Sequence, residues 1–156
     1  MSAARQERNK KRLYLDVCTL CRPFDNQNLM RIRLETDAFY LILQEIQNGI
    51  FEMVSSPVHM KEIGAIKDLR ERLQLSILLH KWAWQPPCDL PKIRKRAEAL
   101  HSLGFGVADA AHVGFAEETA DVFISCDDRL LKKCRKHHVS VESMNPVEFC
   151  VKEDLK

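Results

Sequence analysis

The sequence predicts an α/β fold in which an open parallel sheet is covered by helices on both faces. Short apolar segments of strand-forming composition alternate with amphipathic helical segments along the chain, as in consecutive βαβ units. The chain has 156 residues, a length that suits one domain with its own hydrophobic core. The sequence contains no internal repeat and no low-complexity segment, so we expect no second domain.

The first expected elements are a strand, a loop and a long helix. Residues 12–17 have the pattern of a buried strand with Asp16 at its carboxyl end. Turn-forming residues predict a loop over residues 18–28. Residues 31–48 show the three-and-four spacing of an amphipathic helix, which ends at Gly49. The apolar residues expected on the inner face of this helix are Ile32, Phe39, Ile42, Leu43 and Ile46.

The middle of the chain is expected to contain a second strand and three helices. Residues 51–55 are strand-forming, and the serines before Pro57 provide a hydroxyl cap for a helix that starts there. A second helical run covers residues 67–84, and a weak signal around residues 82–85 indicates a further strand. The third helix covers residues 90–102.

The last third of the domain repeats the strand and helix alternation. Asp109 begins a helix, and the apolar residues 122–125 form a strand that is followed by a helix starting at Asp127. A last short strand is expected at residues 139–141, and a final turn or helix at residues 145–149. The inner face of the helix that begins at Asp109 is expected to consist of Ala108, His112, Phe115 and Ala116.

The composition indicates a cytoplasmic protein. The longest apolar runs are far shorter than the roughly 20 residues of a membrane span. The N-terminal residues lack the apolar core of a secretory signal. The six cysteines are scattered through a chain that has a full-sized core, so we expect reduced thiols.

The net charge of +2 does not make the chain a polycation, but its basic residues are clustered. Residues 1–11 are expected to form a basic, flexible arm before a domain at 12–150 and a tail at 151–156. A second basic cluster covers residues 92–96, and a third covers residues 129–136. Such clusters are often solvated helix faces; the third lies beside a candidate site, where it can hold a nucleic-acid backbone. The candidate RNA-binding residues in it are Arg129, Lys132 and Lys133.

Four acidic residues share a position near the carboxyl ends of the predicted strands. Asp16, Glu62, Asp109 and Asp127 are distant in sequence but can converge at one edge of a parallel sheet. Carboxylates that converge raise one another's pKa values, and a divalent cation relieves this repulsion. An all-oxygen ligand set suits Mg²⁺ or Mn²⁺ and the hydrolysis of phosphodiesters. Each aspartate could instead be an ordinary helix cap, and Glu62 a solvated helix residue, so the prediction depends on the whole set.

The same residues carry a resemblance to a known family. The segments LYLDVCTL, SSPVHMKEI, GVADAAHVGFAE and VFISCDDRLL, in this order, resemble the PIN domain of VapC-type toxins. The resemblance covers nearly the whole domain. It implies a three-layer α/β/α sandwich with a central parallel sheet, Mg²⁺- or Mn²⁺-dependent ribonuclease activity, a homodimer and, for a toxin, a small antitoxin partner. By position, Asp16, Glu62, Asp109 and Asp127 match the catalytic acids of the family, with Asp16, Asp109 and Asp127 as metal ligands.

The chain departs from the family pattern at a few positions. Ser125 replaces the usual threonine, and Cys18 replaces a serine or threonine. Asp128 is a second candidate beside Asp127, and Asp25 lies in a loop reminiscent of a subset of these proteins. His112 lies on an apolar helix face and is expected to be a core residue. The alternative to an enzyme is therefore a catalytically silent module that binds RNA or a protein partner.

Overall fold

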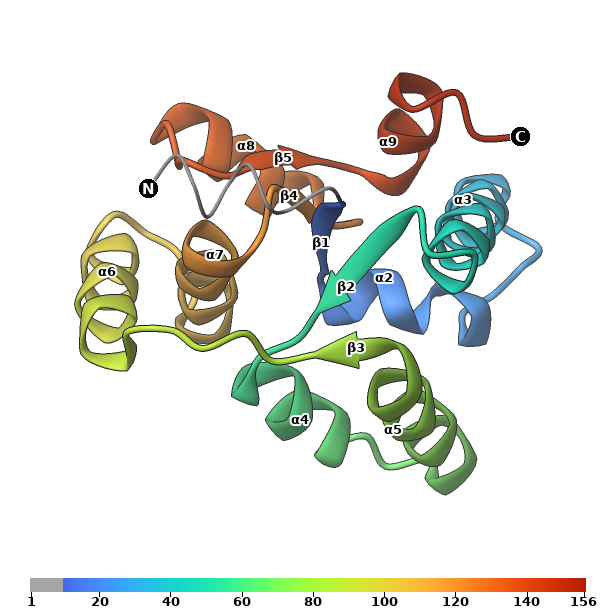
Figure 1. The fold of residues 1–156 in the computed structure, drawn as a ribbon, viewed down its shortest axis with the longest axis horizontal. Helices are drawn as coiled ribbons and strands as arrows, with labels where there is room; N and C mark the ends of the chain where they lie inside the picture. Colours follow the sequence, from blue (N-terminus) through green and yellow to red (C-terminus); the bar gives the residue numbers. More distant parts are fainter. Residues whose placement is uncertain (1–9) are drawn as a thin grey trace.

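The computed structural model describes residues 10–156 and contains a five-stranded parallel sheet with the strand order β3-β2-β1-β4-β5 (Figure 1). The strands are β1 (Lys11–Leu15), β2 (Phe51–Val54), β3 (Ala83–Trp84), β4 (Val122–Ile124) and β5 (Glu142–Met144). The helices are α2 (Val17–Cys21), η1 (Arg22–Phe24), α3 (Met30–Gln47), α4 (Pro57–Gly64), α5 (Leu69–Trp82), α6 (Leu90–Ser102), α7 (Val107–Thr119), α8 (Asp128–Lys136) and α9 (Pro146–Lys152).

Two hydrophobic cores lie on opposite faces of the sheet and confirm the three-layer α/β/α architecture. Leu13 and Leu15 of β1 belong to the core that contains residues of α3, α5 and α9. Tyr14, between them, belongs to the second core, which contains residues of α6, α7 and α8. This division follows from the alternation of side chains along a strand. In Figure 1, α3, α5 and α9 lie on one side of the sheet, and α6, α7 and α8 lie on the other.

Several local predictions are confirmed. The helix expected at residues 90–102 coincides with α6, and the weakly indicated strand near residue 83 is β3. Ser56 is the N-cap of α4, where its hydroxyl accepts a hydrogen bond from the backbone N–H of Val58. Gly49 has a positive φ of 79°, which explains why α3 ends there.

The loop predicted at residues 18–28 is wrong in its first half, because α2 and η1 occupy this segment. The sequence of α2 contains no side-chain cap, and two of its five residues are β-branched, so its helical propensity is low. Tertiary packing stabilises the helix instead, since Leu20 and Thr19 are both fully buried. The backbone N–H groups of these two residues donate to the carbonyl of Asp16.

The last strand was also predicted wrongly, at residues 139–141 instead of β5. The register of β5 is set by β4, whose Val122 and Ile124 pair with Glu142 and Met144. Val139 and Val141, which suggested a strand, pack into the second core within the connection after α8. Their β-branched side chains were therefore a signal of burial and not of sheet pairing.

The expected inner face of α7 is only partly correct. Ala108 is exposed and not on the inner face of α7, whose buried residues include Ala110 and Val113 as well as His112 and Ala116. This offset arises because α7 packs against both α6 and β4. Residues 1–9 of the predicted basic arm are outside the part of the chain that the structure describes.

No helix of the described part is long and apolar enough to cross a membrane.

We expect Gly49→Ala to lower the free energy of unfolding by about 1 kcal/mol, because alanine is strained at a positive φ. Gly64→Ala is the matched control. Gly64 ends α4 with open space within 4 Å of an added Cβ, so alanine there should be neutral or stabilising by up to about 1 kcal/mol. Urea denaturation measures both variants, and equal losses of stability would contradict the assignment of Gly49.

Candidate metal centre

Asp16 lies at the centre of the carboxyl edge of the sheet. It follows β1 in an extended conformation, and its backbone N–H donates to the Ile124 carbonyl of β4 at 2.8 Å. The residue is only 6% exposed. Its Oδ2 atom accepts hydrogen bonds from Ser125 Oγ at 2.9 Å and from Cys18 Sγ at 3.4 Å. These two donors fix the orientation of a buried carboxylate.

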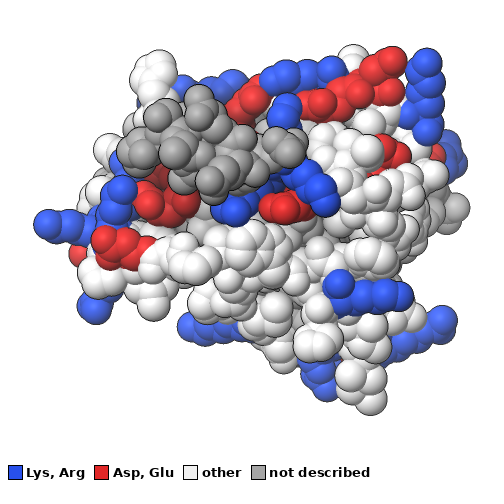
Figure 2. Space-filling model, in the orientation of Figure 1, with Lys and Arg blue, Asp and Glu red and all other residues white. Residues whose placement is uncertain are grey.

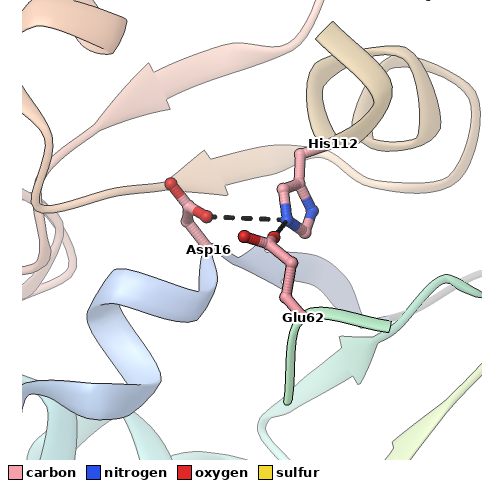
Figure 3. Close-up of side chains that lie close together, drawn as sticks. All are labelled: Asp16, Glu62 and His112. Atoms are coloured by element: carbon pink, nitrogen blue, oxygen red, sulfur yellow. Dashed lines mark hydrogen bonds and ion pairs between the residues drawn. The ribbon is translucent and has the colours of Figure 1, made fainter. Parts of the chain in front are cut away.

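Glu62 of α4 and His112 of α7 come from different elements and meet on the same side of Asp16 (Figure 3). One potential ligand atom from each of the three residues lies within 4.8 Å of the others. His112 Nε2 is hydrogen bonded to Glu62 Oε1 and lies 3.8 Å from Asp16 Oδ1. This hydrogen bond lowers the pKa of Glu62, although partial burial opposes the shift. The Glu62 side chain is 37% exposed, so the group of residues opens to solvent on this side.

Asp109 is in the first turn of α7, one turn before His112. Burial raises the pKa of Asp109, and the negative charges of Asp16 and Asp127 raise it further. The carboxyl group therefore lies within the electrostatic field of the other acids. Its shift has the direction expected for several carboxylates held at one site without a compensating cation.

Asp127 is linked to Asp16 through Ser125. The Ser125 hydroxyl donates to Asp16 and accepts a hydrogen bond from the backbone N–H of Asp127 at 3.1 Å. The Asp127 carboxylate caps α8 by accepting from the N–H groups of Arg129 and Leu130, and the residue is exposed. Serine at position 125 thus supplies one hydroxyl that contacts both Asp16 and the start of α8.

The structure separates Asp127 from its neighbour Asp128. Both carboxylate oxygens of Asp128 accept hydrogen bonds from Arg31 of α3, at 2.6 and 2.7 Å. Asp25 is likewise paired, with Arg22 at 2.9 Å. Asp128 and Asp25 are therefore engaged in ion pairs outside the group formed by Asp16, Glu62 and His112.

His112 is the residue of this group that sequence reasoning did not select. It was expected to be a core histidine, and its side chain is indeed only 1% exposed. However, both ring nitrogens have polar partners, since Nδ1 lies 2.6 Å from the Tyr14 hydroxyl and Nε2 contacts Glu62. The available signal was its spacing of three residues from Asp109, which places both side chains toward one side of α7.

The basic residues expected to bind RNA differ in availability. Arg129 and Lys132 are exposed on α8, whereas Lys133 is half-buried and donates to the Gly104 carbonyl at 2.8 Å. Helices α4 and α5 also carry exposed basic residues. The charged side chains in view over α4 and α5 in Figure 2 are Lys and Arg. The exposed basic residues of these helices and their connection are Lys61, Lys67, Arg70 and Lys81.

Comparison with solved structures finds chains that are similar to this one in fold. No protein-family model and no curated protein matches the chain significantly. The structure described as "FitAcB from Neisseria gonorrhoeae" superposes with a TM-score of 0.49 and 14% sequence identity, over 86% of this chain and 97% of that chain. A similarity of this degree does not bear on the activity of this chain.

In the presence of a chelator, we expect Asp109→Asn to raise the free energy of unfolding at neutral pH, because the ionised carboxylate is partly buried beside Asp16 and Asp127. A raised folded-state pKa means that the stabilising contribution of Asp109 is complete below its unfolded pKa. That contribution is lost as the pH rises through the folded pKa. The difference between the variant and the wild type should therefore grow from acidic to neutral pH.

Thermal unfolding followed by circular dichroism at several pH values measures this difference. Asp37→Asn, at an exposed position of α3, controls for the loss of one negative charge. An Asp109→Asn protein that is less stable than the wild type at neutral pH without metal would contradict the repulsion described above.

Proposed function

We propose that the protein is a metal-dependent endoribonuclease of the PIN type. The observation that carries this proposal is the convergence of Asp16, Glu62 and His112 within 4.8 Å at the carboxyl edge of a parallel sheet. Asp109 and Asp127 contribute further negative charge beside this group. Ligands of α/β proteins bind at such edges. The four ordered sequence segments that resemble the PIN family support the same assignment.

The donor groups fit a divalent cation. Asp16 is buried, and both hydrogen bonds that its carboxylate accepts within the described residues are made by Oδ2. Its Oδ1 atom faces His112 Nε2 at a distance longer than a hydrogen bond and is therefore available as a ligand. Carboxylate oxygens are the preferred ligands of Mg²⁺ and Mn²⁺. We propose Asp16, Asp109 and Asp127 as metal ligands, with Glu62 acting directly or through a water.

When bound, such a cation lowers the pKa of a coordinated water and stabilises negative charge on phosphoryl oxygens. The protein's own residues would position the reaction. Ser125 and Cys18 orient Asp16, and the Ser125 hydroxyl also connects Asp16 to the start of α8. The hydrogen bond with Cys126 and burial raise the pKa of Cys18, so its thiol remains protonated and can donate to Asp16.

The substrate and partners belong to the same proposal. The exposed Arg129 and Lys132 would hold an RNA backbone near the acids. By its resemblance to VapC-type toxins, the protein would act as the toxin of a toxin–antitoxin pair, form a homodimer and be inhibited by a small antitoxin. The second candidate function is a silent RNA- or protein-binding module, which is favoured by the weaker hydrogen-bond donor Cys18 beside Asp16.

We expect Asp16→Asn and Asp127→Asn each to reduce cleavage of a structured RNA pool by about 100-fold or more in the presence of Mn²⁺ or Mg²⁺. Addition of EDTA should abolish cleavage by the wild type. Asparagine is isosteric with aspartate and is also a good helix N-cap, so both variants should fold. Cleavage is measured by the appearance of new RNA ends at a series of protein concentrations.

Asp128→Asn is the matched control for Asp127→Asn. Asp128 is exposed and paired with Arg31, so its substitution should leave cleavage within about twofold of the wild type. Cleavage that survives EDTA or the Asp16→Asn change would rule out the metal-dependent mechanism. If several RNA classes remain uncut and no metal binds, the silent binding module replaces the enzyme as the better proposal.

We also expect the double substitution Arg129→Ala and Lys132→Ala to weaken RNA binding and to reduce its salt dependence by about one to two units of slope. Fluorescence anisotropy with the Asp16→Asn protein measures binding without cleavage. Arg94→Ala with Lys95→Ala, on the exposed face of α6, removes the same charge elsewhere and should change the slope less. An equal effect of both pairs would show that α8 has no special role.

A further inference from the structure

We propose that His112 Nε2 is a direct ligand of the cation at the Asp16 and Glu62 site, and that the site therefore selects a first-row transition metal over Mg²⁺. This inference rests on the metal centre of the proposed function but not on the ribonuclease activity. It adds a nitrogen donor to a site that the sequence predicted from oxygen donors alone.

The position of Nε2 carries the inference. In Figure 3, this nitrogen faces both carboxylates, and both dashed lines meet at it. It lies 3.8 Å from Asp16 Oδ1 and contacts Glu62 Oε1. A cation bound between the two carboxylates would therefore be adjacent to a buried imidazole. A neutral imidazole nitrogen with its lone pair directed at the cation is a favourable ligand.

The hydrogen bonds on the Nδ1 side of His112 are compatible with a proton on either ring nitrogen. The Tyr14 hydroxyl lies 2.6 Å from His112 Nδ1 and 2.7 Å from Ser56 Oγ. Both hydroxyl groups can donate or accept, so this chain of hydrogen bonds can run in two directions.

In one direction, Ser56 donates to Tyr14, Tyr14 donates to Nδ1, and Nε2 carries a proton toward Glu62. In the other direction, Nδ1 carries the proton and donates to Tyr14, Tyr14 donates to Ser56, and the lone pair of Nε2 is available to a cation. The Ser56 oxygen then accepts from Tyr14 and from the backbone N–H of Val58. Metal-bound histidines commonly have such a partner on the second ring nitrogen.

His59 is the neighbouring histidine, and its hydrogen bonds exclude it as the ligand. Its Nδ1 accepts from the backbone N–H of Ser56, and its Nε2 lies 2.7 Å from the Leu15 carbonyl, to which it donates. Burial, above all, lowers the pKa of His59 to about 4, so this ring is neutral. His59 holds the start of α4 against the end of β1 and has no free nitrogen.

A ligand set that adds one imidazole nitrogen to the carboxylates suits Mn²⁺, Co²⁺ or Zn²⁺ better than Mg²⁺, which prefers oxygen ligands. We therefore expect His112→Gln to weaken Mn²⁺ binding by about 10-fold or more and Mg²⁺ binding much less. Tyr14→Phe removes the partner of Nδ1 and should weaken Mn²⁺ binding in the same direction. Isothermal titration calorimetry of the purified protein with each metal measures both effects.

Electron spin-echo envelope modulation of the Mn²⁺-loaded protein tests the coordination itself. The wild type should show modulation from a coordinated imidazole nitrogen, and His112→Gln should lose it. His80→Gln, at an exposed position of α5, is the matched control and should retain it. Tyr14→Phe should also retain the signal. If His112→Gln does not fold, the wild-type measurement still tests the inference.

The inference is overturned if the Mn²⁺-loaded wild type shows no nitrogen modulation, or if the signal persists in folded His112→Gln. RNA cleavage without a nitrogen signal would overturn the role of His112 and leave the proposed ribonuclease in place. A nitrogen signal without RNA cleavage would support His112 as a ligand while the proposed function fails.

Discussion

The repulsion among carboxylates at one edge of the sheet is the constraint on which the candidate site depends. Parallel strands end at the same edge, so Asp16 after β1 and Asp127 after β4 come together because of the fold itself. The raised pKa of Asp109 reflects the unfavourable electrostatic energy of holding several partly buried carboxylates together. The repulsion lowers the stability of the folded protein without metal. A bound cation would remove the repulsion and so stabilise the folded state.

Neutral hydroxyl and thiol groups, in addition to charges, hold the site together. Ser125 and Cys18 donate to Asp16, and Tyr14 connects Ser56 to His112. The nearby arginines Arg22 and Arg31 are paired with Glu35, Asp25 and Asp128, and so they do not neutralise Asp16. These ion pairs keep both arginines from compensating the negative charge at the site, which a bound cation could do instead.

The fold was largely predictable because its signals are local, whereas the wrong elements depended on packing. Residues 90–102 and the Ser56–Pro57 helix start have clear periodicity or capping chemistry. The helix α2 has neither and forms because Leu20 enters the core. At the site, the positions of Asp16 and Glu62 followed from strand and helix ends. The pairing of Asp128 with Arg31 involves residues 97 positions apart, and no local pattern reveals it.

The role of His112 shows how one strand connects core packing to chemistry. Tyr14 and Asp16 are two residues apart along an extended chain, so both face the layer that contains α7. An inward-facing residue of α7 must meet one of them, and His112 meets both. An apolar residue at position 112 would leave the Tyr14 hydroxyl with Ser56 alone and Glu62 without its hydrogen bond. His112 is therefore buried because it makes polar contacts with Tyr14 and Glu62. The apolar sequence pattern of α7 gave no indication of these contacts.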